Sequence, residues 1–188
     1  MGLRTFIAVE LPAPVREALA QVCLQLAAAW AGGPVRWTPT DNLHLTLRFL
    51  GDTDEERIGP VRDLLDGIAA AAVPLELDLG VVGAFPNVRR PRVIWAGLEG
   101  EGREGLDLLQ GRVEHGVRAL GWEREGRAFH PHLTLGRVRQ GAPEPPARWL
   151  RVRVPARQVP VRELVLVRSV LTPAGADYGC LHRVPLMT

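Results

Sequence analysis

The chain has 188 residues, of which 46% are hydrophobic and 23% are charged, a composition typical of a folded globular protein and not of a disordered one. No apolar run approaches the roughly 18 residues that cross a bilayer, and no basic segment followed by an apolar one opens the sequence, so we expect a cytoplasmic protein with no membrane partner. The net charge of +2 argues against a general polyanion binder.

In chain order, the first half predicts alternating strands and helices. Short apolar or alternating runs predict strands, and apolar residues at three- and four-residue steps predict helices. The expected strands cover residues 5–9, 35–37, 43–50 and 75–79, the expected helices run from Pro14 to Trp30 and from Asp54 to Ile68, and a loop covers residues 83–91.

The second half repeats this order. We expect strands at residues 93–98, 132–138, 151–155, 163–170 and 181–186, and a helix over 101–120. The recurring order of strand, helix, strand, strand and helix suggests an internal duplication. Strands that outnumber helices and alternate in polarity favour antiparallel sheets, so residues 1–188 predict a single α+β domain with two similar lobes.

The basic residues are unusual in kind and in distribution. All 23 are arginines, whose planar fork of donors suits phosphate. Residues 137–168 contain eight arginines and two glutamates, a local excess of six positive charges. A solvated strand face and a footprint for a phosphate backbone both explain this excess. The two cysteines, Cys23 and Cys180, predict buried free thiols, because their wide separation suits neither a zinc site nor a redox pair.

A triplet of histidine, any residue and threonine occurs twice, at His44 to Thr46 and at His132 to Thr134, each time within an apolar run. On a strand, residues two apart share a face, so each histidine and threonine lie together while the leucines take the other face. Five histidines and eight threonines in 188 positions predict about 0.2 such triplets, so two copies arise by chance in roughly one sequence in fifty. The repetition disfavours purely structural histidines.

Two imidazoles and two hydroxyls around one volume can catalyse displacement at phosphorus. With pKa values near 6.5, one histidine can accept a proton from a nucleophile while the other donates one to a leaving oxygen. Threonine hydroxyls can hydrogen-bond the non-bridging oxygens. The residues alone do not say which histidine is the acid.

A metal centre is the competing chemistry. His130 and His132 offer two imidazoles, but no aspartate, glutamate or cysteine clusters near either triplet to complete a coordination sphere. Neither cysteine, nor Ser169, stands in a context that activates a covalent nucleophile. We therefore expect acid–base catalysis with no metal and no cofactor.

With their flanking residues, the triplets resemble those of the bacterial and archaeal RNA 2′,3′-cyclic phosphodiesterases, also called 2′-5′ RNA ligases, of the two-histidine phosphoesterase superfamily. Residues 4–12 resemble the family's opening strand, 42–51 its first motif, 90–95 its middle strand and 129–137 its second motif, while the tail fits more loosely. The resemblance implies a bilobal α+β fold of mainly antiparallel sheet with outer helices. Its two lobes would be related by a pseudo-twofold axis and separated by an active-site cleft.

The resemblance also implies an activity. It implies hydrolysis of RNA 2′,3′-cyclic phosphate ends to 2′-phosphates, with 2′-5′ ligation as the reverse reaction, by a protein that we expect to be a monomer. It makes His44 the proton donor and His132 the proton acceptor, and it gives phosphate binding to Thr46 and Thr134 and charge neutralisation to Arg137.

Position and chemistry add further candidates. Arg137 lies five residues past His132 on the same predicted strand. Arg92, Phe49 and Phe85 can contact a nucleotide, the phenylalanines by stacking, although core or rim positions also suit all three.

Two other functions stay open. The first is a phosphodiesterase that acts on small cyclic nucleotides, and the second is a non-catalytic module that binds RNA ends. Binding alone does not need proton-transfer groups in duplicate, which disfavours the second.

Overall fold

The computed structural model describes residues 3–30, 33–172 and 175–187. Within these ranges, three helices and nine strands follow one another as β1 (Leu3–Glu10), α1 (Ala13–Ala29), β2 (Val35–Trp37), β3 (His44–Thr53), α2 (Glu55–Ala70), β4 (Leu75–Phe85), β5 (Val93–Glu99), α3 (Arg103–Ala119), β6 (His132–Val138), β7 (Gln158–Val161), β8 (Glu163–Thr172) and β9 (Gly175–Pro185). No helix in the described ranges is both long enough and apolar enough to cross a membrane.

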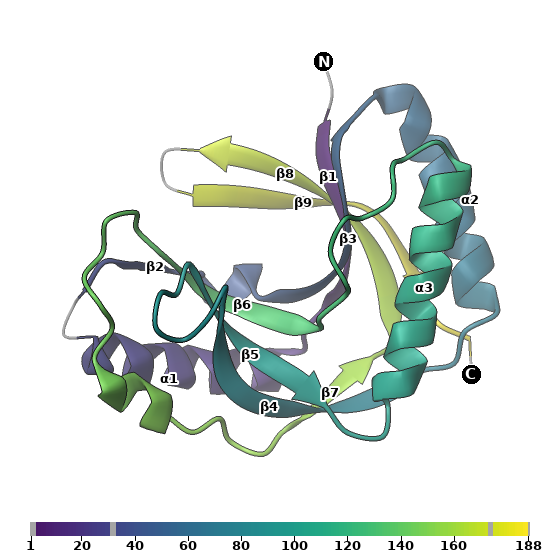
Figure 1. Cartoon of the computed structure of the whole chain (residues 1–188). Coiled ribbons are helices and arrows are strands. Elements are labelled where there is room, and N and C mark those ends of the chain that lie inside the picture. Colours follow the sequence, from purple (N-terminus) through teal and green to yellow (C-terminus); the bar gives the residue numbers. More distant parts are fainter. Residues whose placement is uncertain (1–2, 31–32, 173–174, 188) are drawn as a thin grey trace.

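The strands form one antiparallel sheet that curls upon itself (Figure 1). Its order is β7-β4-β5-β6-β3-β1-β8-β9, with β2 paired to β6 at one side. Each half of the chain gives a strand to the other half, because β4 pairs with β5 and β8 pairs with β1. The predicted α+β class with mainly antiparallel pairing is confirmed.

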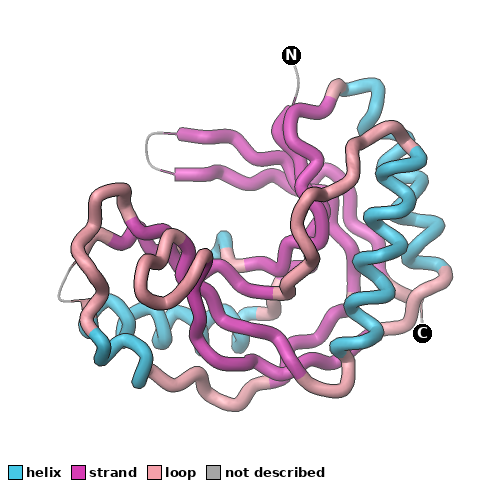
Figure 2. The backbone as a smooth tube through the Cα atoms, viewed as in Figure 1, coloured by secondary structure: helices cyan, strands magenta, loops and turns pink. Residues whose placement is uncertain are grey.

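The helices cover one face of this sheet and leave the other free of helices, as the tube drawing shows (Figure 2). The central strands β3 and β6 send their leucines into the core beneath the helices, where Leu45, Leu47, Leu133 and Leu135 are buried. Strand alternation then puts the intervening residues on the opposite face, which we call the open face. A small second cluster, which includes Phe6 and Ala8 of β1, lies on the open face.

One buried charge connects the first half to the second. Arg48 of β3 is 8% exposed and donates from Nε to Glu114 Oε2 of α3 at 2.6 Å. It also donates to the backbone carbonyls of Phe49 and Glu123. Arg48 therefore joins the strand of the first triplet to the helix and the connection that precede the second.

Several predicted strand limits, one predicted strand and one predicted burial are wrong. β4 continues through Gly83 to Phe85 because these residues pair with β5, and the ring of Trp95 on β5 occupies the space where a Cβ on residue 83 would lie. No strand forms over residues 151–155. A short 3-10 turn at Ala147–Arg151 buries Trp149 there, and pairing resumes only at β7.

The strand of the first triplet also runs past Gly51, which takes a φ of 71°, to Thr53. Both thiols are free as expected, but only Cys23 is buried. Cys180 on β9 is exposed.

Candidate active site

The two triplets lie on neighbouring strands in the middle of the sheet. β3 and β6 pair antiparallel through the central leucines, Leu45 opposite Leu133. Since both leucines point into the core, the histidine and threonine of each triplet stand on the open face. All four side chains are half-buried.

The antiparallel register crosses the triplets over. With the leucines opposite each other, the register places His44 across from Thr134, and Thr46 across from His132. The four polar side chains therefore occupy neighbouring positions of the two strands on the open face.

Each histidine is oriented by the same local hydrogen bond. Nδ1 of His44 lies 2.8 Å from the carbonyl oxygen of Asn42, and Nδ1 of His132 lies 2.7 Å from that of His130. A carbonyl oxygen only accepts, so Nδ1 carries the proton in both neutral rings and Nε2 presents a lone pair. The Thr46 hydroxyl, 3.0 Å from Nε2 of His44, can donate to that lone pair.

β-Bulges bring two further side chains to the open face. Between Ile94 and Trp95, β6 has one extra residue, Leu135, which shifts the alternation by one position. Arg137 is therefore exposed on the open face, while Val138 packs against the core. The extra residue of β3 at the equivalent place, Leu47, does the same for Phe49, which is 55% exposed.

His44 is surrounded by aromatic rings. Phe6 stacks on its imidazole, with ring centroids 4.8 Å apart, and Tyr178 of β9 meets it edge-on at 5.3 Å. Phe49 lies 5.8 Å from Phe6 and extends this surface outward. Burial raises the pKa of Tyr178, and the charges of Arg137 and Arg4 act in the opposite direction.

His132 has its own aromatic neighbours. Phe85 meets the ring edge-on at 5.0 Å, and Trp95 lies at 6.4 Å. His130, two residues before it, also contacts both of these rings. Phe85 is thus in the site, as a wall of the second histidine.

Burial lowers the pKa of both histidines, but their charged neighbours differ. At His44 the backbone bond to Asn42 and the carboxylate of Glu10 oppose the effect of burial, while the charge of His132 adds to it. Glu10 is the direct cross-strand neighbour of His44 on β1. At His132 only the backbone bond opposes burial, and the charges of His130 and Arg137 lower the pKa further. A carboxylate therefore opposes the lowering of the pKa at His44, and no carboxylate among the described residues does so at His132.

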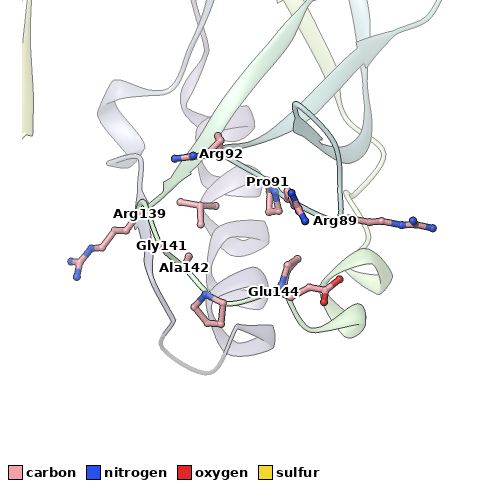
Figure 3. A pocket seen from close by; sticks show the side chains of 11 residues that line it. Arg89, Pro91, Arg92, Arg139, Gly141, Ala142 and Glu144 are labelled. Atoms are coloured by element: carbon pink, nitrogen blue, oxygen red, sulfur yellow. The ribbon is translucent and has the colours of Figure 1, made fainter.

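The remaining candidate lies apart from this group. Arg92 precedes β5 and lines a surface hollow of about 580 Å³ between the β4–β5 loop and the segment after β6 (Figure 3). Its backbone is nevertheless hydrogen-bonded to a residue of the site, since the Arg92 amide donates to the Phe85 carbonyl at 2.6 Å.

Glu10, Phe6 and Tyr178 were not predicted as site residues. All three lie within stretches that resemble the family, but only the pairing of β1 with β3 and of β8 with β9 brings them to His44. In the described part of the chain, no three histidine, cysteine, aspartate or glutamate side chains gather as metal ligands would.

Comparison with known proteins identifies the family. The model of the LigT-like phosphoesterases matches residues 9–95 and 97–178, and each segment contains one triplet. A protein named RNA 2′,3′-cyclic phosphodiesterase from Archaeoglobus fulgidus is 32% identical over 96% of this chain and 98% of its own length, and one of the same name from Thermus thermophilus is 35% identical over 98% and 90%.

Solved structures support the same family. The crystal structure of E. coli LigT in complex with 3′-AMP is 28% identical over all of both chains, with a TM-score of 0.74. The chain therefore belongs to the LigT-like phosphoesterase family.

Proposed function

We propose that this protein hydrolyses RNA 2′,3′-cyclic phosphate ends to 2′-phosphates by acid–base catalysis that needs no metal ion. The observation that carries the proposal is the pair of triplets on neighbouring strands, in which both imidazoles stand on the open face and each is held through Nδ1 by the same kind of backbone hydrogen bond. Its relatives named RNA 2′,3′-cyclic phosphodiesterase support the substrate.

Proton transfer runs from water to the leaving oxygen. Nε2 of His132 takes a proton from a water molecule, whose oxygen attacks the phosphorus. The bond from phosphorus to the 3′ oxygen breaks, and that oxygen receives a proton from Nε2 of His44. The phosphate stays on the 2′ oxygen. The neighbouring charges support this direction, since Glu10 opposes the lowering of the His44 pKa and Arg137 adds to the lowering of the His132 pKa.

The other side chains on the open face bind the cyclic phosphate and the terminal base of the substrate. Thr46 and Thr134 hydrogen-bond the non-bridging oxygens, and Arg137 neutralises the charge that builds up on them. Phe49 offers an exposed ring on which the terminal base stacks. Attack by a 5′-hydroxyl on the same cyclic phosphate gives a 2′-5′ linkage, so the same residues catalyse ligation where an RNA end replaces water.

A phosphodiesterase for small cyclic nucleotides is the second candidate. The complex of E. coli LigT with 3′-AMP favours it, because that relative binds a mononucleotide phosphorylated on the ribose. Relative rates on mononucleotide and oligonucleotide substrates separate the two candidates.

The deciding experiment uses an RNA decamer that ends in a 2′,3′-cyclic phosphate. We expect hydrolysis in the presence of chelator and a 2′-phosphate by ³¹P NMR. His44→Ala and His132→Ala should each lower the rate by roughly 10²- to 10⁴-fold, and the double variant should be no slower than the slower single one, because the two act as a unit. His115→Ala, exposed on α3, is the control. Full activity in either single variant, a 3′-phosphate product, or inactivation by chelator would refute the proposal.

A further inference from the structure

The surface hollow that contains Arg92 is lined by arginines. Four of them surround it, Arg89, Arg90 and Arg92 from the β4–β5 loop and Arg139 from the end of β6, against one acid, Glu144. Three prolines, at residues 91, 143 and 145, shape its walls. The hollow therefore has an excess of three positive charges on a restricted backbone.

These arginines are free to bind a ligand. All four are exposed, and within the described ranges none has a carboxylate within ion-pair distance. In Figure 3 the side chains of Arg89 and Arg139 extend in different directions from opposite sides of the hollow, and neither meets Glu144. The loop backbone is fixed instead by Asn87, whose side-chain oxygen accepts from the amides of Arg89 and Arg90 at 3.0 Å.

Backbone hydrogen bonds connect the lining of the hollow to the candidate active site. The Arg92 amide donates to the carbonyl of Phe85, whose ring is a wall of His132. The Val138 amide in turn donates to the carbonyl of Arg92 at 3.0 Å. Along β6, the path from His132 to Val138 is about 20 Å at 3.3 Å per residue, and Arg137 stands on the open face between them. A strand of RNA stacked at about 3.4 Å per nucleotide crosses that distance with about six nucleotides.

We propose that this hollow binds the phosphate backbone of the RNA that precedes the cyclic end. The inference rests on the proposed function, since it takes the cyclic phosphate to lie between the two triplets. Arginine forks hold phosphate oxygens in pairs, and along β6 Arg137 lies between His132 and the hollow. The occupant is single-stranded RNA several nucleotides long, and the protein distinguishes it from a mononucleotide by these contacts.

The test compares two substrates and two double variants. Arg89→Gln with Arg139→Gln removes two charges from the hollow, and Arg62→Gln with Arg118→Gln removes two exposed arginines from α2 and α3 as a matched control. The substrates are a decamer with a 2′,3′-cyclic phosphate end and 2′,3′-cyclic AMP, each assayed at several salt concentrations.

We expect the hollow variant to lower kcat/KM for the decamer about tenfold, mainly through KM, and to flatten its dependence on salt, because fewer counterions are released. The kcat/KM for 2′,3′-cyclic AMP should change less than twofold, and the control variant should behave as the unaltered protein. Equal loss on both substrates, or no loss on the decamer, would overturn the proposal.

Failure of the proposed function gives a different result. If neither substrate is hydrolysed by the unaltered protein, fluorescence anisotropy with a labelled decamer that ends in a 2′-phosphate still tests the hollow. A Kd that the hollow variant raises about tenfold and the control does not would then support RNA binding there, and equal Kd values would refute it.

Discussion

Replacement of Arg48 by methionine tests whether the two halves of the molecule depend on one buried ion pair. Arg48 is 8% exposed and its partner Glu114 is 19% exposed, so both charges are largely withdrawn from water. Removing one partner of such a pair leaves a buried carboxylate and costs roughly 3–5 kcal/mol. The second carboxylate, Glu125, is 42% exposed at 3.4 Å and adds little.

The expected loss in the free energy of unfolding is measurable by urea unfolding followed by tryptophan fluorescence. For a chain of this size, 3–5 kcal/mol lowers Tm by roughly 6–20 °C. Arg48→Met with Glu114→Gln removes both charges, and we expect this double variant to be more stable than Arg48→Met alone. A single-variant loss below about 1 kcal/mol, or a double-variant loss equal to the sum of the two single ones, would refute the reasoning.

Three further outcomes follow from local features. Because burial lowers the pKa of His44 below its ordinary value of 6.5, the unfolded chain binds the proton more readily, so the free energy of unfolding falls as the pH drops through 6.5 toward the lowered value. His44→Gln should flatten this decline, and an unchanged slope would contradict the cause. Gly83→Ala forces a Cβ against the ring of Trp95 and should destabilise by roughly 1–3 kcal/mol, whereas Gly111→Ala, with open space around it, should not destabilise. In the folded protein a thiol reagent should label the exposed Cys180 but not Cys23, whose pKa burial raises to about 11. Equal labelling would contradict the burial.

Much of the architecture and the central histidines were predictable because they depend on short periodicities. The alternation of leucines with histidine and threonine fixes which side chains share a face, and that rule needs only the local sequence. The helices could be placed from their apolar spacing in the same way. The prediction at residues 151–155 was wrong because alternation there does not tell a paired strand from an unpaired segment that packs Val152 and Val154 against the core.

What the sequence could not provide is register between distant strands. Strict alternation puts Arg137, five residues after His132, on the core face, and only the extra residue in β6 returns it to the open face. Glu10 lies beside His44 because of a pairing between β1 and β3 that spans more than thirty residues of chain. Tyr178 reaches the same imidazole from β9, near the other end of the chain. No local sequence pattern predicts these contacts.

The exchange of β4 and β8 between the halves has a consequence for how such a molecule arose and unfolds. If each half descends from one ancestral unit, the strand equivalent to β4 or β8 paired with a second copy of that unit and not with its own, as in a domain-swapped homodimer. Fusion of the two copies makes the exchange intramolecular. Neither half then keeps a complete sheet when the other opens, so the chain should unfold in one cooperative step and not lobe by lobe.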